Sequence, residues 1–189
     1  MRGKPSRSAS IELRGRRVFL RPPQSADGGE FTRLMKQSAR AFRGLIHPVK
    51  KGRKRFDDYL KRCAREDFLG FLICRSADGC MLGNINLFNI IRPGTQSACV
   101  GYLVGAPFAR QGYATEALQL ILRFAFVKLK LHRVEANIQP DNIPSIAVVK
   151  RAGFSKEGFS PRYIKISGRW RDHERWALQS EKWRKRRGK

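Results

Sequence analysis

A strand, a turn of small residues and an amphipathic helix follow one another between residues 100 and 129, and this order restricts the fold more than any other feature. Residues 100–103 read Val-Gly-Tyr-Leu, as a buried strand does, and the turn ends at Gly112. Apolar residues then recur at helical spacing and predict a helix over 112–129; they are Ala114, Ala117, Leu118, Ile121, Leu122, Ala125 and Leu129. The first amides of a helix have no partners within it and can bind an anion. The segment therefore fits a phosphate site, although an ordinary turn explains it equally well when it is taken alone.

The residues after this helix predict a second strand and a second helix. His132–Ile138 alternates between polar and apolar residues, as a half-buried strand does. Asn142 is a suitable helix N-cap and Pro144 fits a first helical turn. Gly153 suits the left-handed residue that ends a helix, so we predict a short helix over 144–152.

Together these segments resemble the GNAT acetyltransferase superfamily, and within it the RimJ/RimL branch of ribosomal-protein N-terminal acetyltransferases. The RimJ type is the best single match, and the resemblance runs from about Arg17 to Trp183. Further landmarks are Ala98–Tyr102, His132-Arg133, Lys156–Phe159 and Gly168–His173. The resemblance implies an α/β GNAT fold: a single mixed seven-stranded sheet with splayed central strands, flanked by about four helices.

The remaining patterns predict one alternating α/β domain. The chain has 189 residues, of which 41% are hydrophobic and 12 are phenylalanine, enough to fill one core. Strands are predicted at 18–21, 68–75, 81–91, 98–104, 133–139, 159–166 and 170–178, and helices at 30–36, 53–66, 112–129 and 144–152. We expect a flexible basic N-terminal tail over 1–15, the GNAT domain over 16–180 and a basic C-terminal tail over 181–189.

The resemblance implies acetyl-CoA as co-substrate and assigns residues to it. The expected cofactor-binding residues are Val100, Gly101, Leu103, Arg110, Gln111, Gly112, Tyr113, Ala114, Thr115, Asn137 and Asn142. A backbone N–H near Tyr102 would face the oxyanion that forms on the thioester. Ser145 is the candidate proton donor to the departing thiolate. The superfamily more usually has a tyrosine as the general acid, and Val149 stands at that position here. Helix capping explains Asn142 equally well.

Three positions depart from the pattern of the superfamily. Ala109 stands where Gln or Arg is usual, and Arg110 stands where glycine is frequent, so Arg110 either restores charge to the phosphate loop or narrows it. Cys99 replaces a glutamate that can act as a base in many relatives. An α-amine, with a pKa of about 7.7–8.0, needs a base less than a lysine near 10.4 does. Glu116 fits an early-helix charge, and Glu135 is left as an alternative carboxylate.

The formal net charge of +25 is extreme for an enzyme of small molecules. One basic cluster comprises Arg43, Lys50, Lys51, Arg53, Lys54 and Arg55, and a second comprises Lys182, Arg184, Lys185, Arg186, Arg187 and Lys189. Such a surface attracts polyphosphates, including coenzyme A and RNA, although each run alone is also typical of a solvated face. Trp183 is a candidate for stacking on a base or for fixing the tail to the fold.

Cysteine and histidine usage indicates a reducing compartment and no metal. The cysteines are Cys63, Cys74, Cys80 and Cys99, and the histidines are His47, His132 and His173. Their spacing fits neither a disulfide framework nor a metal site. No run approaches the ~20 apolar residues of a membrane span, and the N-terminus lacks an apolar signal core. We expect a cytoplasmic monomer or homodimer that binds no membrane.

The predicted reaction is transfer of acetyl from acetyl-CoA to a protein N-terminal α-amine, by direct attack in a ternary complex. The acceptor would be the alanine or serine terminus of a protein, for which a ribosomal protein is the first candidate, and the basic surface would contact the ribosome or RNA. An acyl-enzyme on Cys99 is the weaker idea, since nothing nearby in the sequence depresses its pKa. Two other functions stay open: a small-molecule amine acetyltransferase, and a non-catalytic module that binds CoA or RNA.

Overall fold

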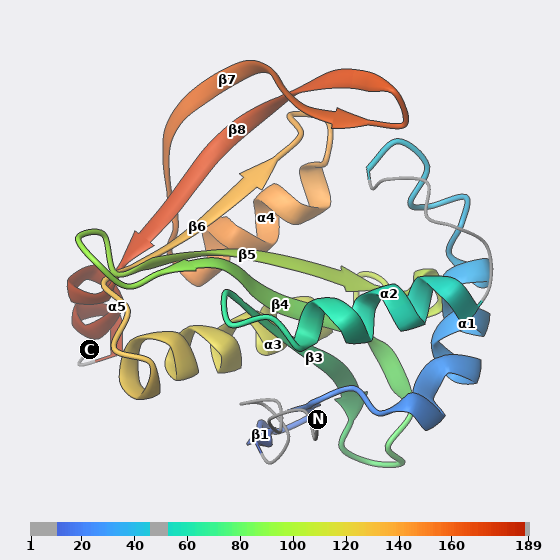
Figure 1. Ribbon diagram of the computed structural model, residues 1–189. Coiled ribbons are helices and arrows are strands. Elements are labelled where there is room, and N and C mark those ends of the chain that lie inside the picture. The colour runs from blue at the N-terminus through green and yellow to red at the C-terminus, as the bar shows by residue number, and fades with distance from the viewer. Residues whose placement is uncertain (1–10, 46–52, 188–189) are drawn as a thin grey trace, which may run out of the picture.

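The computed structural model describes residues 11–45 and 53–187, which form one mixed sheet with helices on both faces (Figure 1). The strands are β1 (Leu13–Arg14), β2 (Val18–Arg21), β3 (Phe68–Arg75), β4 (Met81–Ile91), β5 (Ser97–Val104), β6 (Arg133–Ile138), β7 (Ser155–Ile166) and β8 (Arg169–Gln179). The helices are α1 (Gly28–Gln37), α2 (Arg53–Cys63), α3 (Tyr113–Arg123), α4 (Ile143–Ala152) and α5 (Ser180–Arg187). The sheet order is β1-β2-β3-β4-β5-β6-β8-β7, and β5 and β6 are its parallel neighbours. The predicted GNAT fold is confirmed, with eight strands in place of seven and five α-helices in place of about four.

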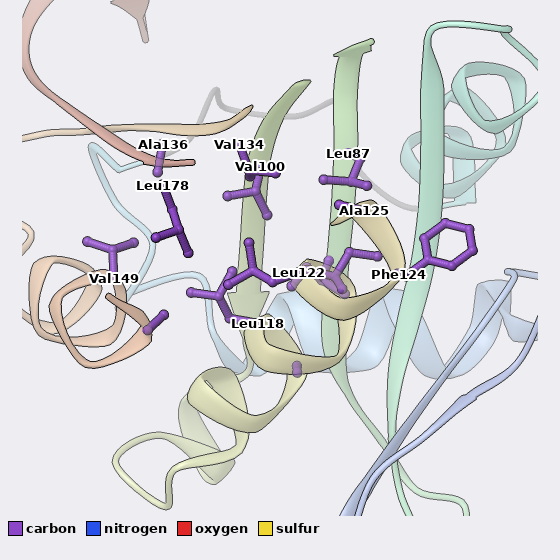
Figure 2. Packing of buried hydrophobic residues seen from close by; sticks show 14 of the residues in the cluster. Leu87, Val100, Leu118, Leu122, Phe124, Ala125, Val134, Ala136, Val149 and Leu178 are labelled. Atoms are coloured by element: carbon purple, nitrogen blue, oxygen red, sulfur yellow. The ribbon is translucent and has the colours of Figure 1, made fainter. Parts of the chain in front are cut away.

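Two apolar layers hold the helices to the sheet. On one face α3 buries Ala117, Leu118, Ile121 and Leu122 completely against the strands, at the spacing that the sequence predicts. Figure 2 shows Leu118 and Leu122 of α3 close to Leu87, Val100 and other residues of this layer. On the opposite face α1 and α2 pack Phe31, Phe56 and Tyr59 together over β3 and β4. Within the described part of the chain no helix is long and apolar enough to span a membrane.

The two parallel strands at the centre separate after a short stretch of pairing. Only Ser97, Ala98 and Cys99 of β5 are in register with β6, opposite Arg133, Val134 and Glu135. Beyond Cys99 the strands diverge like the arms of a V, and β6 continues beside β8 while β5 stays with β4 (Figure 1). This is the splay that the family resemblance implies. It leaves one edge of β5 over residues 100–104 without a strand partner.

The two elements that the sequence analysis missed lie in the segments assigned to tails. β1 has only two residues, which pair with Leu20 and Phe19, and two residues are too few to show an alternation. α5 is cationic on nearly all sides, so it has no apolar stripe that predicts a helix. Its Trp183 is nevertheless 6% exposed, and its ring centroid lies 5.4 Å from that of Phe126. Trp183 therefore fixes α5 to the core and is not available to stack on a base.

Several local predictions are confirmed in detail. Asn142 caps α4 by accepting a hydrogen bond from the Ser145 amide (3.2 Å), and Gly153 ends the helix with a φ of 100°. The predicted helix over 112–129 is α3 followed by a π-helical segment, Phe124–Lys128. Four residues named in the sequence analysis lie outside the described residues. They are Lys50 and Lys51 of the basic cluster near residue 50, His47, and Lys189 of the C-terminal cluster.

Candidate active site

A cavity of about 830 Å³ opens where β5 and β6 separate. Twelve residues predicted for the site line it: Val100, Gly101, Tyr102, Leu103, Arg110, Gly112, Tyr113, Ala114, Thr115, Asn137, Asn142 and Ser145. Gln111 does not, because its side-chain amide donates to the Pro107 carbonyl (3.3 Å) instead. The cavity reaches both faces of the sheet, since its lining includes residues of α3 and α4 as well as Phe42 and Leu45, which follow α1.

The N-terminus of α3 faces this cavity with unpaired backbone amides. The first helical hydrogen bond of α3 runs from the Glu116 amide to the Gly112 carbonyl (3.1 Å). The amides of Tyr113, Ala114 and Thr115 come before Glu116 and therefore have no acceptor within the helix. Gly112 has a φ of 82°, which glycine adopts without strain. Arg110 has a φ of 61°, so it keeps the left-handed backbone of the glycine that is frequent in relatives. The loop thus presents amides and a helix dipole to an anion.

Glu116 is a structural anchor for this loop. Its Oε1 accepts hydrogen bonds from the Arg17 amide (2.7 Å) and the Val18 amide (3.3 Å), and these bonds tie the start of β2 to α3. The Arg17 guanidinium carbon lies 5.1 Å from the centre of the Tyr113 ring, beside Gly112, and brings positive charge to the helix N-terminus. Glu116 is therefore engaged in this contact and does not line the cavity.

Two hydroxyl groups meet in the cavity at the mouth of α4. The Tyr102 hydroxyl oxygen lies 2.9 Å from Ser145 Oγ, and it also donates to the Ser145 carbonyl (3.1 Å). Burial raises the pKa of Tyr102 to about 12, so the phenol keeps its proton at neutral pH. Asn142 holds the Ser145 amide, whereas the Ser145 hydroxyl is hydrogen-bonded to Tyr102. The pair can supply a proton to a group that leaves with negative charge.

Amide side chains line the part of the cavity that faces α1 and α2. Asn84 and Asn86 of β4 lie opposite Leu103 and Gly101 of β5, and a Cβ at Gly101 would lie 3.2 Å from the Phe88 ring. The Tyr59 hydroxyl donates to Asn86 Oδ1 (2.7 Å). Burial raises the pKa of Tyr59 well above its usual range, against the effect of a hydrogen bond with the Asn84 side chain. Asn84 is 6% exposed, and its Oδ1 accepts no hydrogen bond from any described residue.

The opposite wall of the cavity contains His173 and Gln139. His173 is 3% exposed and lies on β8, with Nδ1 at 3.0 Å from the Arg171 carbonyl oxygen. Since a carbonyl only accepts, Nδ1 carries the ring proton and Nε2 carries the free lone pair. Burial lowers the pKa of His173. Gln139 follows β6, and its side-chain amide donates to the Gly44 carbonyl (2.9 Å), which fastens the segment after α1 to this wall.

The two remaining candidates for catalysis, Cys99 and Glu135, lie side by side at the point where β5 and β6 still pair. Burial, helped by the charge of Glu135, raises the pKa of the Cys99 thiol to about 11. The Glu135 carboxylate accepts from Arg133 Nε at 2.6 Å. A protonated thiol and a paired carboxylate are a poor nucleophile and a poor base, and neither residue lines the cavity.

The ionisable side chains that line the cavity are basic and not acidic. Among the described residues that line the cavity there is no aspartate or glutamate, whereas Arg110, Arg151 and His173 are basic. In residues 11–45 and 53–187, no three His, Cys, Asp or Glu side chains gather closely enough to hold a metal ion. The lining therefore suits a polyanionic ligand and a neutral second ligand.

Sequence reasoning missed the residues of the wall nearest α1 and α2. Asn84 and Asn86 stand two apart in a strand that is otherwise mainly apolar, and this spacing is a signal for polar groups on one face. His173 lies within one of the quoted landmarks, but its position on the cavity depends on the register of β8 against β6. No local pattern encodes that register.

Comparison with known proteins places this geometry in a family. The acetyltransferase (GNAT) domain family matches residues 17–155. "Probable N-acetyltransferase YjcK" of Bacillus subtilis is 34% identical over 173 residues, which cover 88% of this chain and 96% of that protein. [Ribosomal protein uS5]-alanine N-acetyltransferase of Escherichia coli is 34% identical over 103 residues, 54% of this chain and 53% of that enzyme. The structure of Mycobacterium smegmatis RimJ in complex with CoA-disulfide superposes with a TM-score of 0.80 at 30% identity, over 87% of this chain and 82% of the other.

Proposed function

This chain belongs to the GNAT acetyltransferase family and is an acetyl-CoA-dependent N-acetyltransferase, and from that premise we propose that its acceptor is the N-terminal α-amine of a protein. One observation carries the proposal: the cavity joins the helix amides and the Tyr102–Ser145 hydroxyls to a second wall that has no carboxylate among its described residues. Alanine or serine at the terminus of a ribosomal protein is the first candidate, and the name of the E. coli relative specifies alanine.

The charge of the lining favours an α-amine over a polyamine or a lysine. A polyamine is held best by carboxylates, whereas the described lining is neutral or basic. An α-amine with a pKa of about 7.7–8.0 has a neutral fraction at pH 7 that is roughly several hundred times that of a lysine near 10.4. The neutral amine enters this cavity without a counter-ion, so the α-amine fits it better.

The proposed roles follow the family resemblance and the positions of the residues. The pyrophosphate of acetyl-CoA binds the amides at Gly112 to Thr115, with Arg110 beside them, and the pantetheine arm runs along the free edge of β5. The amine attacks the thioester directly, and a backbone N–H near Tyr102 stabilises the oxyanion. Ser145 then protonates the thiolate, supported by the Tyr102 hydroxyl at 2.9 Å. The raised pKa of Cys99 supports direct attack over an acyl-enzyme.

Peptide acetylation tests the proposed acceptor. We expect kcat/KM to be highest for a peptide that begins with Ala, Ser or Thr. It should be roughly tenfold or more above the values for spermidine and for an N-terminally blocked peptide with an internal lysine, because a larger fraction of the α-amine is neutral at pH 7. A peptide that begins with Leu should react more slowly, since its side chain meets the wall formed by Leu103 and Phe42. Rapid acetylation of spermidine or of the blocked peptide, with none of the alanine peptide, would contradict the proposal.

We propose that the basic surface contacts ribosomal RNA and that the enzyme acts in the cytoplasm. On α5, Lys182 bonds to Ser155 Oγ and Arg186 donates to the Arg151 carbonyl, whereas Arg184 and Lys185 are exposed to solvent. Phosphate groups that replace counterions at such side chains give salt-dependent binding.

The salt dependence of RNA binding tests this contact. Substituting both Arg184 and Lys185 with Ala should reduce the slope of log affinity against log salt by roughly 1.4–1.8, because each phosphate contact contributes about 0.7–0.9. Deleting α5 is unsuitable, since Trp183 is part of the core. The control substitutes Lys36 and Lys61, exposed on α1 and α2, with Ala. Equal slopes for both double variants would remove α5 as the RNA contact.

A further inference from the structure

We propose that Asn84 and His173 bind the acceptor amine, with Asn84 Oδ1 orienting the amine and His173 Nε2 accepting its proton. The proposal rests on the proposed function, because it concerns the amine that attacks the thioester. Both residues line the same cavity as Tyr102 and Ser145. They come from the two separated arms of the sheet, Asn84 from β4 and His173 from β8, so the acceptor would lie between the arms.

Asn84 provides an acceptor atom that none of the residues the structure describes uses. A buried amide oxygen without a hydrogen bond is destabilising, because it has lost its bonds to water, so such a group needs a partner of its own. Asn84 is 6% exposed, its side chain bonds to Tyr59, and no described residue donates to its Oδ1. Tyr59 is itself fixed by its hydrogen bond to Asn86 (2.7 Å). The oxygen is therefore held in place within the cavity wall, where it has almost no solvent-accessible surface of its own, and an N–H group of the bound acceptor would complete it.

His173 provides a base in the required protonation state. The bond from Nδ1 to the Arg171 carbonyl (3.0 Å) fixes the tautomer, and the lone pair is on Nε2. Alternation along β8 places Trp176 and Leu178 in the layer under α3 and α4, so His173 lies on the opposite face, as the Asn84 side chain does. A neutral imidazole is the commonest general base in proteins.

The surroundings of His173 keep it neutral at pH 7. Burial lowers its pKa below the usual value of about 6.5, against smaller opposing effects of the Arg171 carbonyl, Asp172 and Asp141. Tyr163 of β7 packs on the ring with centroids 6.0 Å apart. Arg171 and Arg175 share its face of β8. The basic form therefore predominates at neutral pH and is lost as the pH falls through the pKa.

The proposed acetyl transfer balances in protons and electrons. The amine nitrogen bonds to the thioester carbonyl carbon, and one N–H proton passes to His173 Nε2. The tetrahedral intermediate then collapses, the C–S bond breaks with its electron pair on sulfur, and the Ser145 hydroxyl protonates the thiolate. Ser145 regains a proton from solvent while His173 releases one, so amine and thioester give amide and free thiol with no other reactant.

Two substitutions separate a basic role of His173 from a structural one. In His173→Asn the amide nitrogen can still donate to the Arg171 carbonyl, but the base at Nε2 is lost; in His173→Gln the amide occupies the Nε2 position instead. We expect both to lower kcat/KM for an alanine peptide by roughly 100- to 10,000-fold at unchanged acetyl-CoA affinity. The control is His132→Asn, which removes an exposed histidine beside Glu181.

The pH profile supplies the readout that a structural role would not change. The wild-type log kcat/KM should fall with a slope of about two below the pKa values of both His173 and the α-amine, and the His173 variants should fall with a slope of about one. For Asn84→Leu, KM for the peptide should rise roughly tenfold or more, because the oriented hydrogen bond is lost. Full activity of His173→Asn with an unchanged slope, or an unchanged KM for Asn84→Leu, would overturn the corresponding half of the proposal.

The outcomes distinguish this proposal from the proposed function. If the wild type acetylates another amine and no alanine peptide, the proposed acceptor is wrong, and the same variants are then assayed on the amine that reacts. Nitrogen-15 NMR of the histidine rings needs no activity: it should show His173 neutral and protonated on Nδ1 at pH 7. A ring that is protonated on Nε2, or that carries a charge at that pH, would overturn the basic role.

Discussion

Ser145→Ala is expected to lower kcat by roughly 10- to 1000-fold while acetyl-CoA affinity stays within about twofold, because the thiolate then departs without its proton donor. The substitution leaves the helix cap in place, since Asn142 bonds to the Ser145 backbone amide and not to its hydroxyl. Steady-state kinetics with a saturating alanine peptide, together with calorimetric titration of acetyl-CoA, measure the two quantities separately.

Tyr102→Phe shows whether the two hydroxyls act as one unit. If the phenol at 2.9 Å supports the Ser145 hydroxyl, its loss should cost much less in the Ser145→Ala background than in the wild type. Ser97→Ala is the matched control, because it removes a hydroxyl that is hydrogen-bonded to Thr95 at the other end of β5. An unchanged kcat for Ser145→Ala would leave the residue without a role in proton transfer.

Gly112→Val is expected to weaken acetyl-CoA binding by roughly 10- to 100-fold. Hydrogen bonds from amides to phosphate oxygens depend on this turn, and losing about one of them, at about 1.5–3 kcal/mol, corresponds to this range. A Cβ at Gly112 would lie 3.0 Å from Arg17 Nη2, and valine strongly disfavours the φ of 82°. Calorimetric titration gives the dissociation constant.

Gly79→Val is the control for backbone strain. Gly79 has a similar φ of 74°, and its Cβ would meet no atom within 4 Å in the turn between β3 and β4. Both variants should lower Tm by about 2–8 °C, and only Gly112→Val should lose affinity. An equal loss in both would mean that binding falls through stability alone, and a retained affinity for Gly112→Val would place the pyrophosphate elsewhere.

Local patterns in the sequence predicted the elements that use local chemistry. The buried face of α3 follows a helical period, and α4 has a capping asparagine at one end and a left-handed glycine at the other. The turn between β3 and β4 likewise shows itself in Asp78 and Gly79, where Asp78 pairs with Arg75 at 2.6 Å. Each of these signals lies within a few residues of the structure it sets.

The acceptor side of the site depends on contacts between distant residues, which no local pattern records. Asn84 and His173 meet the same cavity from strands that are 89 positions apart in the chain, and only the order β4-β5-β6-β8 brings them to it. The burial of Trp183 was equally unpredictable, because it depends on Phe126 and not on a pattern within α5. The family resemblance supplied the donor side by its motifs, and it carried no comparable motif for the wall that contains Asn84.

The short pairing of β5 with β6 also affects the order of events in a catalytic cycle. Under the proposed function, a cavity that reaches both faces of the sheet would let the nucleotide and the amine approach from opposite directions, where they would not obstruct one another. An enzyme already loaded with acetyl-CoA can then sample one chain terminus after another without releasing its donor. Each turnover consumes one acetyl group, so the donor would be exchanged once for each terminus that is acetylated and not once for each terminus that is met.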